Sequence, residues 1–180
     1  MEGSYKITRI VQHTGDIISI KVGLDSGTII NILHNPILFN DILEEILKKG
    51  NILHIHAETL REVPAVLERD YNWSIDDANS KLKGFIDGYN VKIVPKNRNN
   101  PLYQGMREAC EKENINFHPP DAFIVADFKL AGINKVYSGD NSVVRACNFF
   151  GMIGIKTPTV DRKLSEKLRD IFRRPKVYRK

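Results

Sequence analysis

Short apolar segments typical of strands alternate with longer amphipathic segments typical of helices along most of this chain. The predicted strands are 17–24, 51–56, 91–94, 135–137 and 152–155. The predicted helices are 36–50, a helix from about residue 58 that Pro64 kinks or restarts, 75–87, 102–112, 121–131 and 143–150. This alternation predicts an α/β fold, a three-layer α/β/α sandwich in which helices cover both faces of a central, mostly parallel sheet.

The 180 residues suit one principal domain with an appendage at each end. Residues 1–16 are predicted to add an edge strand, with alternating residues at 6–11, and residues 17–160 to form the main domain. Residues 161–180 are predicted to form a basic helix and tail, with nine Lys or Arg against three acidic residues. The other 160 residues have eighteen against nineteen, so the tail carries the basic excess. Such a tail either keeps the chain in solution or binds phosphate groups.

The composition argues against several other classes of protein. Two cysteines give no disulfide framework, which favours a reducing cytosol. The apolar run "ACNFFGMIGI" is half the length of a membrane span of about 20 residues, and "MEGSYKITRI" lacks the apolar region of a signal peptide. No phosphate-cradling glycine motif occurs. His54 and His56 share one face of a strand, but two histidines are too few for a zinc site.

The stretch "PPDAFIVADFKLAGINKVYSGD", residues 119–140, places an acid at each end of a helix and strand. Asp121 opens the helix after two prolines, and Asp140 follows the strand. An antiparallel return of the helix brings its first residue beside the carboxyl end of the strand, so the two acids are expected to meet. Asp127, in the middle of the helix, is expected to face solvent.

Two further acids occupy corresponding places. Asp25 directly follows the first strand, and Glu62 lies about one turn into the helix after "NILHIH". Taken singly, each of the four acids is explained as a helix cap, a turn residue or an exposed helix residue. Taken together, they are expected to converge at one sheet edge, where like charges raise one another's pKa unless a cation neutralises them. Magnesium or manganese is the oxygen-preferring partner.

Three segments in this order resemble PIN-domain nucleases. "IKVGLDSGTII" resembles the family's opening strand with its acid, "HAETLREV" its Thr-x-x-Glu helix start, and residues 119–140 its Asp, helix, strand and Ser/Thr-x-Asp segment. The resemblance covers roughly residues 17–156. It differs from the usual pattern at Gly27, where the family often has a small polar residue. It also differs after Asp140, where Asn141 and Ser142 are the nearest candidates for a further acid or amide.

The resemblance implies a magnesium- or manganese-dependent ribonuclease. The implied catalytic and metal-binding residues are Asp25, Glu62, Asp121 and Asp140, supported by Ser26, Thr59, Ser138 and Asn141. A basic rim has to offset the repulsion between these acids and RNA. The candidates for that rim are Lys96, Arg98, Arg173, Arg174, Lys176, Arg179 and Lys180. The implied partners are RNA, a second copy of the chain in a homodimer or larger oligomer, and an antitoxin or ribonucleoprotein partner.

Three alternatives stay open at this point. The first is a PIN-like module that binds RNA or protein without cutting. The second is a phosphatase or phosphotransferase of the aspartyl-phosphate kind, which usually needs an acid where Gly27 stands. The third is a particular kind of nuclease, the toxin of a toxin–antitoxin pair.

Overall fold

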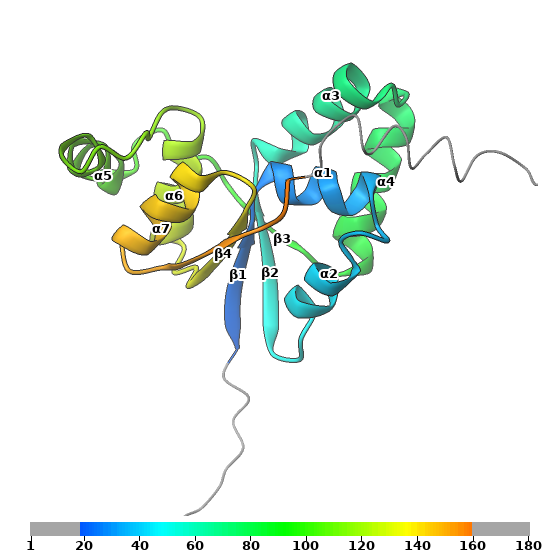
Figure 1. Cartoon of the computed structure of the whole chain (residues 1–180), viewed down its shortest axis with the longest axis horizontal. Helices are drawn as coiled ribbons and strands as arrows, with labels where there is room; N and C mark the ends of the chain where they lie inside the picture. The colour runs from blue at the N-terminus through cyan, green and yellow to red at the C-terminus, as the bar shows by residue number, and fades with distance from the viewer. Residues whose placement is uncertain (1–18, 160–180) are drawn as a thin grey trace, which may run out of the picture.

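A five-stranded sheet forms the centre of the computed structural model, which describes residues 19–159 (Figure 1). The strands are β1 (Ile20–Leu24), β2 (Asn51–His56), β3 (Lys92–Val94), β4 (Lys135–Ser138) and β5 (Ile153–Lys156). They lie in the order β3-β2-β1-β4-β5, and each neighbouring pair is parallel. All five carboxyl ends therefore lie at one edge of the sheet. The predicted edge strand at 6–11 and the basic tail at 161–180 lie outside the described residues.

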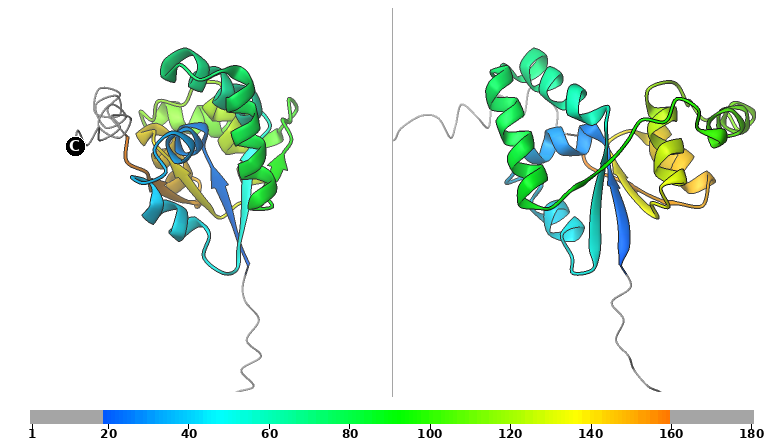
Figure 2. Two further views of the ribbon diagram at one scale, coloured as in Figure 1. Left: turned by 90° about the vertical axis from the view of Figure 1, so that its right-hand side faces the viewer. Right: turned by 180° about the vertical axis from the view of Figure 1, so that it is seen from behind.

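Helices cover both faces of the sheet (Figures 1 and 2). They are α1 (Ser26–His34), α2 (Asn40–Ile46), α3 (Thr59–Tyr71), α4 (Ile75–Gly88), α5 (Pro101–Lys112), α6 (Asp121–Leu130) and α7 (Asn141–Phe149). Helices α1 to α4 bury residues such as Ile29 and Leu67 in one core, whereas α5 to α7 bury residues such as Phe128 in a second core. The predicted three-layer sandwich is confirmed.

Strand β1 alternates between the two cores. Val22 and Leu24 are fully buried among α1 to α4, whereas Gly23 lies against α6. A Cβ atom at Gly23 would come within 2.8 and 2.9 Å of ring atoms of Phe128. Helix α6 therefore packs directly on the central strand because residue 23 has no side chain. This close approach brings the first turn of α6 to the end of β1.

The helices between β1 and β2 differ from the prediction. The sequence 36–50 is predicted as one helix, but the structure has turns after Pro36 and a helix α2 that begins only at Asn40. Helix α1 is not among the helices predicted from periodicity. Its β-branched run "TIINI" favours a strand in isolation. Burial of Thr28 to Ile32 and the cap at Asp25 override that preference.

Helix α3 continues through Pro64, so the predicted restart does not occur, and a kink at this residue stays a prediction. Pro64 removes one backbone N–H from the helix, but its neighbours Val63 and Leu67 are fully buried in the first core. Their packing keeps the helix in one piece. The next helix, α4, has a side-chain cap, because the Ser74 hydroxyl accepts a hydrogen bond from the Asp77 N–H at 3.0 Å. Between residues 19 and 159, no helix combines the length and apolar character needed to cross a membrane.

Candidate active site

Asp25 is the first residue after β1 and lies at the carboxyl edge of the sheet. Its backbone N–H donates to the carbonyl oxygen of Tyr137 at 3.1 Å, which ties it to the end of β4. Its carboxylate accepts hydrogen bonds from the Gly27 N–H at 3.0 Å and from the Ser138 hydroxyl. The contact with Gly27 makes Asp25 the N-cap of α1. One carboxylate thus starts a helix and also faces the neighbouring strand.

Glu62 comes from α3, the helix that follows β2, and β2 lies beside β1 on the side opposite to β4. It is half-buried, and its Oε2 atom accepts a hydrogen bond from the Ser26 hydroxyl at 2.7 Å. The hydroxyl oxygens of Ser26 and Thr59 lie 3.3 Å apart. Both hydroxyl residues are buried, and each is the first residue of a helix that follows a strand. The parallel pairing of β1 with β2 therefore brings Glu62 next to the residue that follows Asp25.

Ser138, at the end of β4, connects two of the acids. Its hydroxyl donates to Asp25 and accepts a hydrogen bond from the Asp140 N–H at 2.9 Å. Asp140 is exposed and caps α7, because its Oδ1 atom accepts from the Ser142 N–H at 2.5 Å. Asn141 is exposed at the first position of the same helix. The cap leaves the other carboxylate oxygen of Asp140 outside these contacts.

Asp121 is the first residue of α6 and is half-buried. Burial, followed by the charges of Asp25, Asp140 and Glu62, raises the pKa of the Asp121 carboxyl to about 6. No hydrogen bond from a residue within 19–159 offsets this rise. The structure thus brings all four acids close enough to repel one another.

Asp25 differs from Asp121 because hydrogen bonds to its carboxylate oppose the effects that raise its pKa. Burial raises the pKa of the Asp25 carboxyl, hydrogen bonds from Ser138 and Gly27 oppose the rise, and the charges of Glu62 and Asp140 add to it. The net direction is upward. Two of the four acids therefore hold their charge at a cost in free energy.

A small pocket is bordered by both acids whose pKa is raised. It is lined by Asp25 and Asp121, with apolar walls from Ile124, Val125, Phe128, Val136 and Val143. Across the part of the chain that the structure describes, no three His, Cys, Asp or Glu side chains have the geometry of a ready-made metal site. The donor atoms nevertheless fit a hard divalent cation, because they are carboxylate oxygens whose mutual repulsion a cation relieves.

The predicted basic rim is described only in part. Lys96 and Arg98 lie in the loop after β3, and both are exposed. The Lys96 ammonium donates to Glu58 Oε1 at 2.6 Å and lies 5.6 Å from the centre of the Phe123 ring. Together with Arg61, it lowers the pKa of the Glu58 carboxyl to about 2. The five basic tail residues proposed for RNA binding (Arg173, Arg174, Lys176, Arg179 and Lys180) lie outside the described residues.

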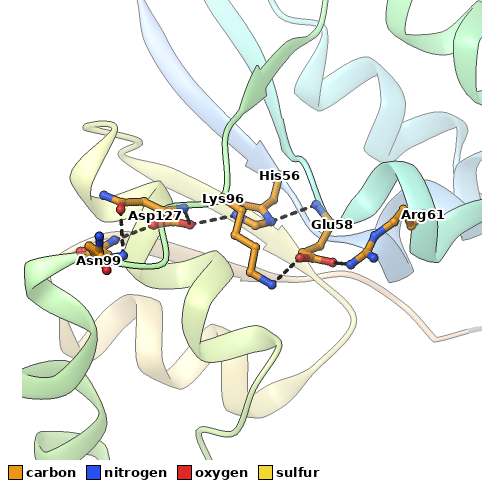
Figure 3. A network of polar contacts seen from close by, with 8 residues as sticks. His56, Glu58, Arg61, Lys96, Asn99 and Asp127 are labelled. Carbon is orange, nitrogen blue, oxygen red and sulfur yellow. Dashed lines mark hydrogen bonds and ion pairs between the residues drawn. The ribbon is translucent and has the colours of Figure 1, made fainter.

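Asp127 is buried, so the prediction that it faces solvent is wrong. Its carboxylate contacts His56 and the loop after β3 (Figure 3). The sequence did contain a signal for this burial. In "DAFIVADFKL" apolar residues occupy every face of the helix, which is typical of a helix covered on both sides. A lone acid inside such a helix indicates a buried partner.

Comparison with known proteins identifies solved structures that have a similar fold. No family model matches the sequence, and no curated protein matches it. Solved structures do match over 76% of this chain. VapBC2 from Rickettsia felis, bound to a promoter DNA fragment, is 16% identical with a TM-score of 0.60, and 98% of that chain is covered. DNA-bound VapBC from Salmonella typhimurium is 17% identical with a TM-score of 0.57, again with 98% covered.

A third similar structure is VapC20 from Mycobacterium tuberculosis, described as a sarcin-ricin loop cleaving toxin. It is 12% identical, with a TM-score of 0.55, and 99% of that chain is covered. At these identities the similarity shows the fold alone. That fold is the one expected from the resemblance in the three sequence segments.

Proposed function

We propose that this chain, which has the PIN-domain fold, is a metal-dependent endoribonuclease that hydrolyses RNA phosphodiester bonds at Asp25, Glu62, Asp121 and Asp140. One observation carries the proposal: burial, followed by the charges of the other three acids, raises the pKa of the Asp121 carboxyl, and no described residue donates a hydrogen bond to it. An arrangement of this kind costs free energy at neutral pH in the absence of a cation.

The four acids would hold Mg²⁺ or Mn²⁺, which lowers the pKa of a bound water and stabilises charge on the phosphate. Ser138 fixes the orientation of Asp25 and the backbone of Asp140, and Ser26 does the same for Glu62. These hydroxyl groups hold the carboxylates in place before a ligand arrives. The residues of α6 that line the pocket beside Asp121 are apolar.

The acid cluster repels RNA, so the substrate needs cationic contacts around it. Lys96 and Arg98 are the described candidates, and the basic tail supplies five more. Lys96 lies between Glu58, one helical turn before Glu62, and Phe123, two residues after Asp121. It therefore stands beside both helices that carry those acids, where a neighbouring phosphate of the substrate would meet it.

The finer proposal is the toxin of a toxin–antitoxin pair in the cytoplasm, acting as a homodimer or larger oligomer. Its support is the similarity to VapBC structures across nearly the whole of each matched chain. A small antitoxin-like protein encoded beside this chain would then co-purify with it and suppress cleavage. If no such protein is encoded beside this chain, and if expression of the chain alone does not inhibit growth, the toxin assignment is contradicted.

Cleavage of single-stranded RNA in Mn²⁺ tests the nuclease proposal. We expect the unsubstituted chain to give products that EDTA abolishes, and Asp121→Asn to lower the rate by about 10²-fold or more. Asp76→Asn is the matched control, because Asp76 is also an acid in a helical first turn but is exposed on α4. It should retain full activity.

The second candidate function is an RNA-binding module that does not cut. Retention of RNA in a gel shift, with no products in Mn²⁺ or Mg²⁺, would favour it over the nuclease. Equal cleavage by the Asp121→Asn variant and the unsubstituted chain would reject the assigned site.

A further inference from the structure

Asp127 is a buried carboxylate that the proposed chemistry does not use. It is 3% exposed in the middle of α6 and accepts three hydrogen bonds (Figure 3). The donors are the His56 ring at 3.0 Å, the Asn97 N–H at 3.0 Å and the Asn100 side-chain amide at 2.7 Å. A buried charge is tolerated when donors of this kind surround it.

The histidine contact has a defined direction. The Glu58 N–H donates to Nδ1 of His56 at 3.1 Å, so this nitrogen carries no hydrogen. The ring hydrogen therefore lies on Nε2, which donates to Asp127. His56 thus connects the start of α3 to α6 through the last residue of β2.

The other two donors belong to the loop between β3 and α5. Asn97 and Asn100 both reach Asp127, and Asn97 Oδ1 also accepts from the Asn99 N–H at 3.0 Å. Asn100 Oδ1 accepts from the Leu102 N–H at 2.9 Å and caps α5. One carboxylate therefore fixes both ends of residues 97–100.

The residue directly before this fixed segment is Lys96. Its ammonium reaches Glu58 on α3 and the ring of Phe123 on α6, the helices that also carry Glu62 and Asp121. Lys96 is exposed, and its position depends on a loop whose nearest anchor is the Asn97 N–H to Asp127 contact.

We infer that Asp127 is a positioning residue for RNA binding: it holds the loop 95–100 so that Lys96 stands at the rim of the acid pocket and contacts a substrate phosphate. This inference rests on the proposed function and names a determinant of its substrate binding. Asp127 itself touches no RNA. Its effect on affinity passes through Lys96.

A double-mutant cycle on the full chain tests this coupling. The probe is a single-stranded RNA oligonucleotide in EDTA, so that binding is measured without cleavage, at several salt concentrations. Lys96→Gln should weaken binding about fivefold at low salt and reduce the slope of log K against log salt by about 0.7, the value for one phosphate contact on a single strand. Asp127→Asn should produce a similar loss, because Asn offers only one acceptor oxygen to three donors.

The double variant decides the question. We expect it to bind no more weakly than Lys96→Gln alone, because both changes remove the same phosphate contact. Losses that multiply, or an Asp127→Asn variant with the affinity and salt slope of the unsubstituted chain, would overturn the inference. Absence of RNA binding by the unsubstituted chain would overturn it as well.

A second variant keeps the test valid if Asp127→Asn does not fold. Asn100→Ser retains a good helix cap for α5 but withdraws the amide that reaches Asp127. It should weaken RNA binding, with faster hydrogen exchange at the Asn97 and Asn99 amides, and unchanged binding despite faster exchange would overturn the inference. Because these readouts need no metal, a chain that binds RNA in this way but never cuts it would refute the nuclease proposal and leave the positioning role intact.

Discussion

Helix α6 carries two buried or half-buried carboxylates that the fold treats in opposite ways. Asp121, at its first position, receives no hydrogen bond from a described residue, and burial together with the charges of three other acids raises its pKa to about 6. Asp127, six residues later, accepts three hydrogen bonds and meets no other acid among its described partners. The charged form of Asp121 is destabilised by its surroundings, and a bound cation would stabilise it. Asp127 stabilises the fold.

Replacement of Asp127 by alanine should produce the largest change in stability. It leaves the His56 ring, the Asn97 N–H and the Asn100 amide without a buried acceptor. We expect a loss of about 3–5 kcal/mol in the free energy of unfolding, measured by urea denaturation. A loss below about 1 kcal/mol would mean that water replaces the carboxylate, and the contrast between the two acids would fail.

Replacement of Asp121 by asparagine should have the opposite sign. The folded pKa of about 6 exceeds the ordinary value of 3.8, so the folded chain binds more protons between pH 4 and pH 6. The stability contributed by protonated Asp121 is therefore lost as pH rises through this window. In EDTA at pH 7.5, Asp121→Asn should raise the melting temperature by about 2–4 °C after allowance for solvent screening of this half-buried group.

The same measurement near pH 3 supplies the control. There the Asp121 carboxyl is largely protonated in both the folded and the unfolded chain, so the difference between the variant and the unsubstituted chain should disappear. Asp76→Asn, on the surface of α4, should show no gain at either pH. A destabilised Asp121→Asn variant at pH 7.5 would show that hidden donors satisfy the carboxylate.

Ser138→Ala should sharpen the comparison with a smaller effect. The hydroxyl donates to Asp25 and accepts from the Asp140 N–H, so its loss should cost about 1–2 kcal/mol in stability. It should also raise the pKa of Asp25 further, because the hydrogen bond from Ser138 opposes the effect of burial. NMR titration of the side-chain carboxyl carbon would detect the shift. An unchanged pKa would show that Ser138 does not hold Asp25.

Ser26→Ala should have the smallest effect of the series. It removes the hydrogen bond to Glu62, which is half-buried, and should cost about 1 kcal/mol. A loss larger than that of Ser138→Ala would show that Glu62, rather than Asp25, is the more tightly held acid.

The contrast between Asp121 and Asp127 also shows what the sequence reveals. The strand and helix periods predict the sandwich, and a parallel sheet places Asp25 and Asp140 at one edge. The position of Asp121 at the same edge is predicted from the helix that precedes β4, because that helix runs antiparallel to the strand. These predictions succeed because each depends on a local pattern and a simple rule of topology.

The local pattern signals the burial of Asp127 but does not identify its hydrogen-bond partners. His56 lies 71 residues away in the sequence, and Asn97 and Asn100 lie in a loop without periodicity. The expectation that Asp127 faces solvent takes α6 for a surface helix, although apolar residues occupy every face of "DAFIVADFKL". Only the packing of α6 between β2 and the loop supplies its partners. Helix α1 was not predicted for a similar reason: its residues prefer a strand in isolation, and only burial in the folded chain overrides that preference.

Calorimetric titration with Mn²⁺ at pH 7.5 tests the central claim most directly, because it asks whether the four acids form a cation site. We predict saturable binding to the unsubstituted chain and to Asp76→Asn, and a loss of about tenfold or more in affinity for Asp121→Asn. Equal Mn²⁺ affinity in Asp121→Asn and the unsubstituted chain would contradict the account.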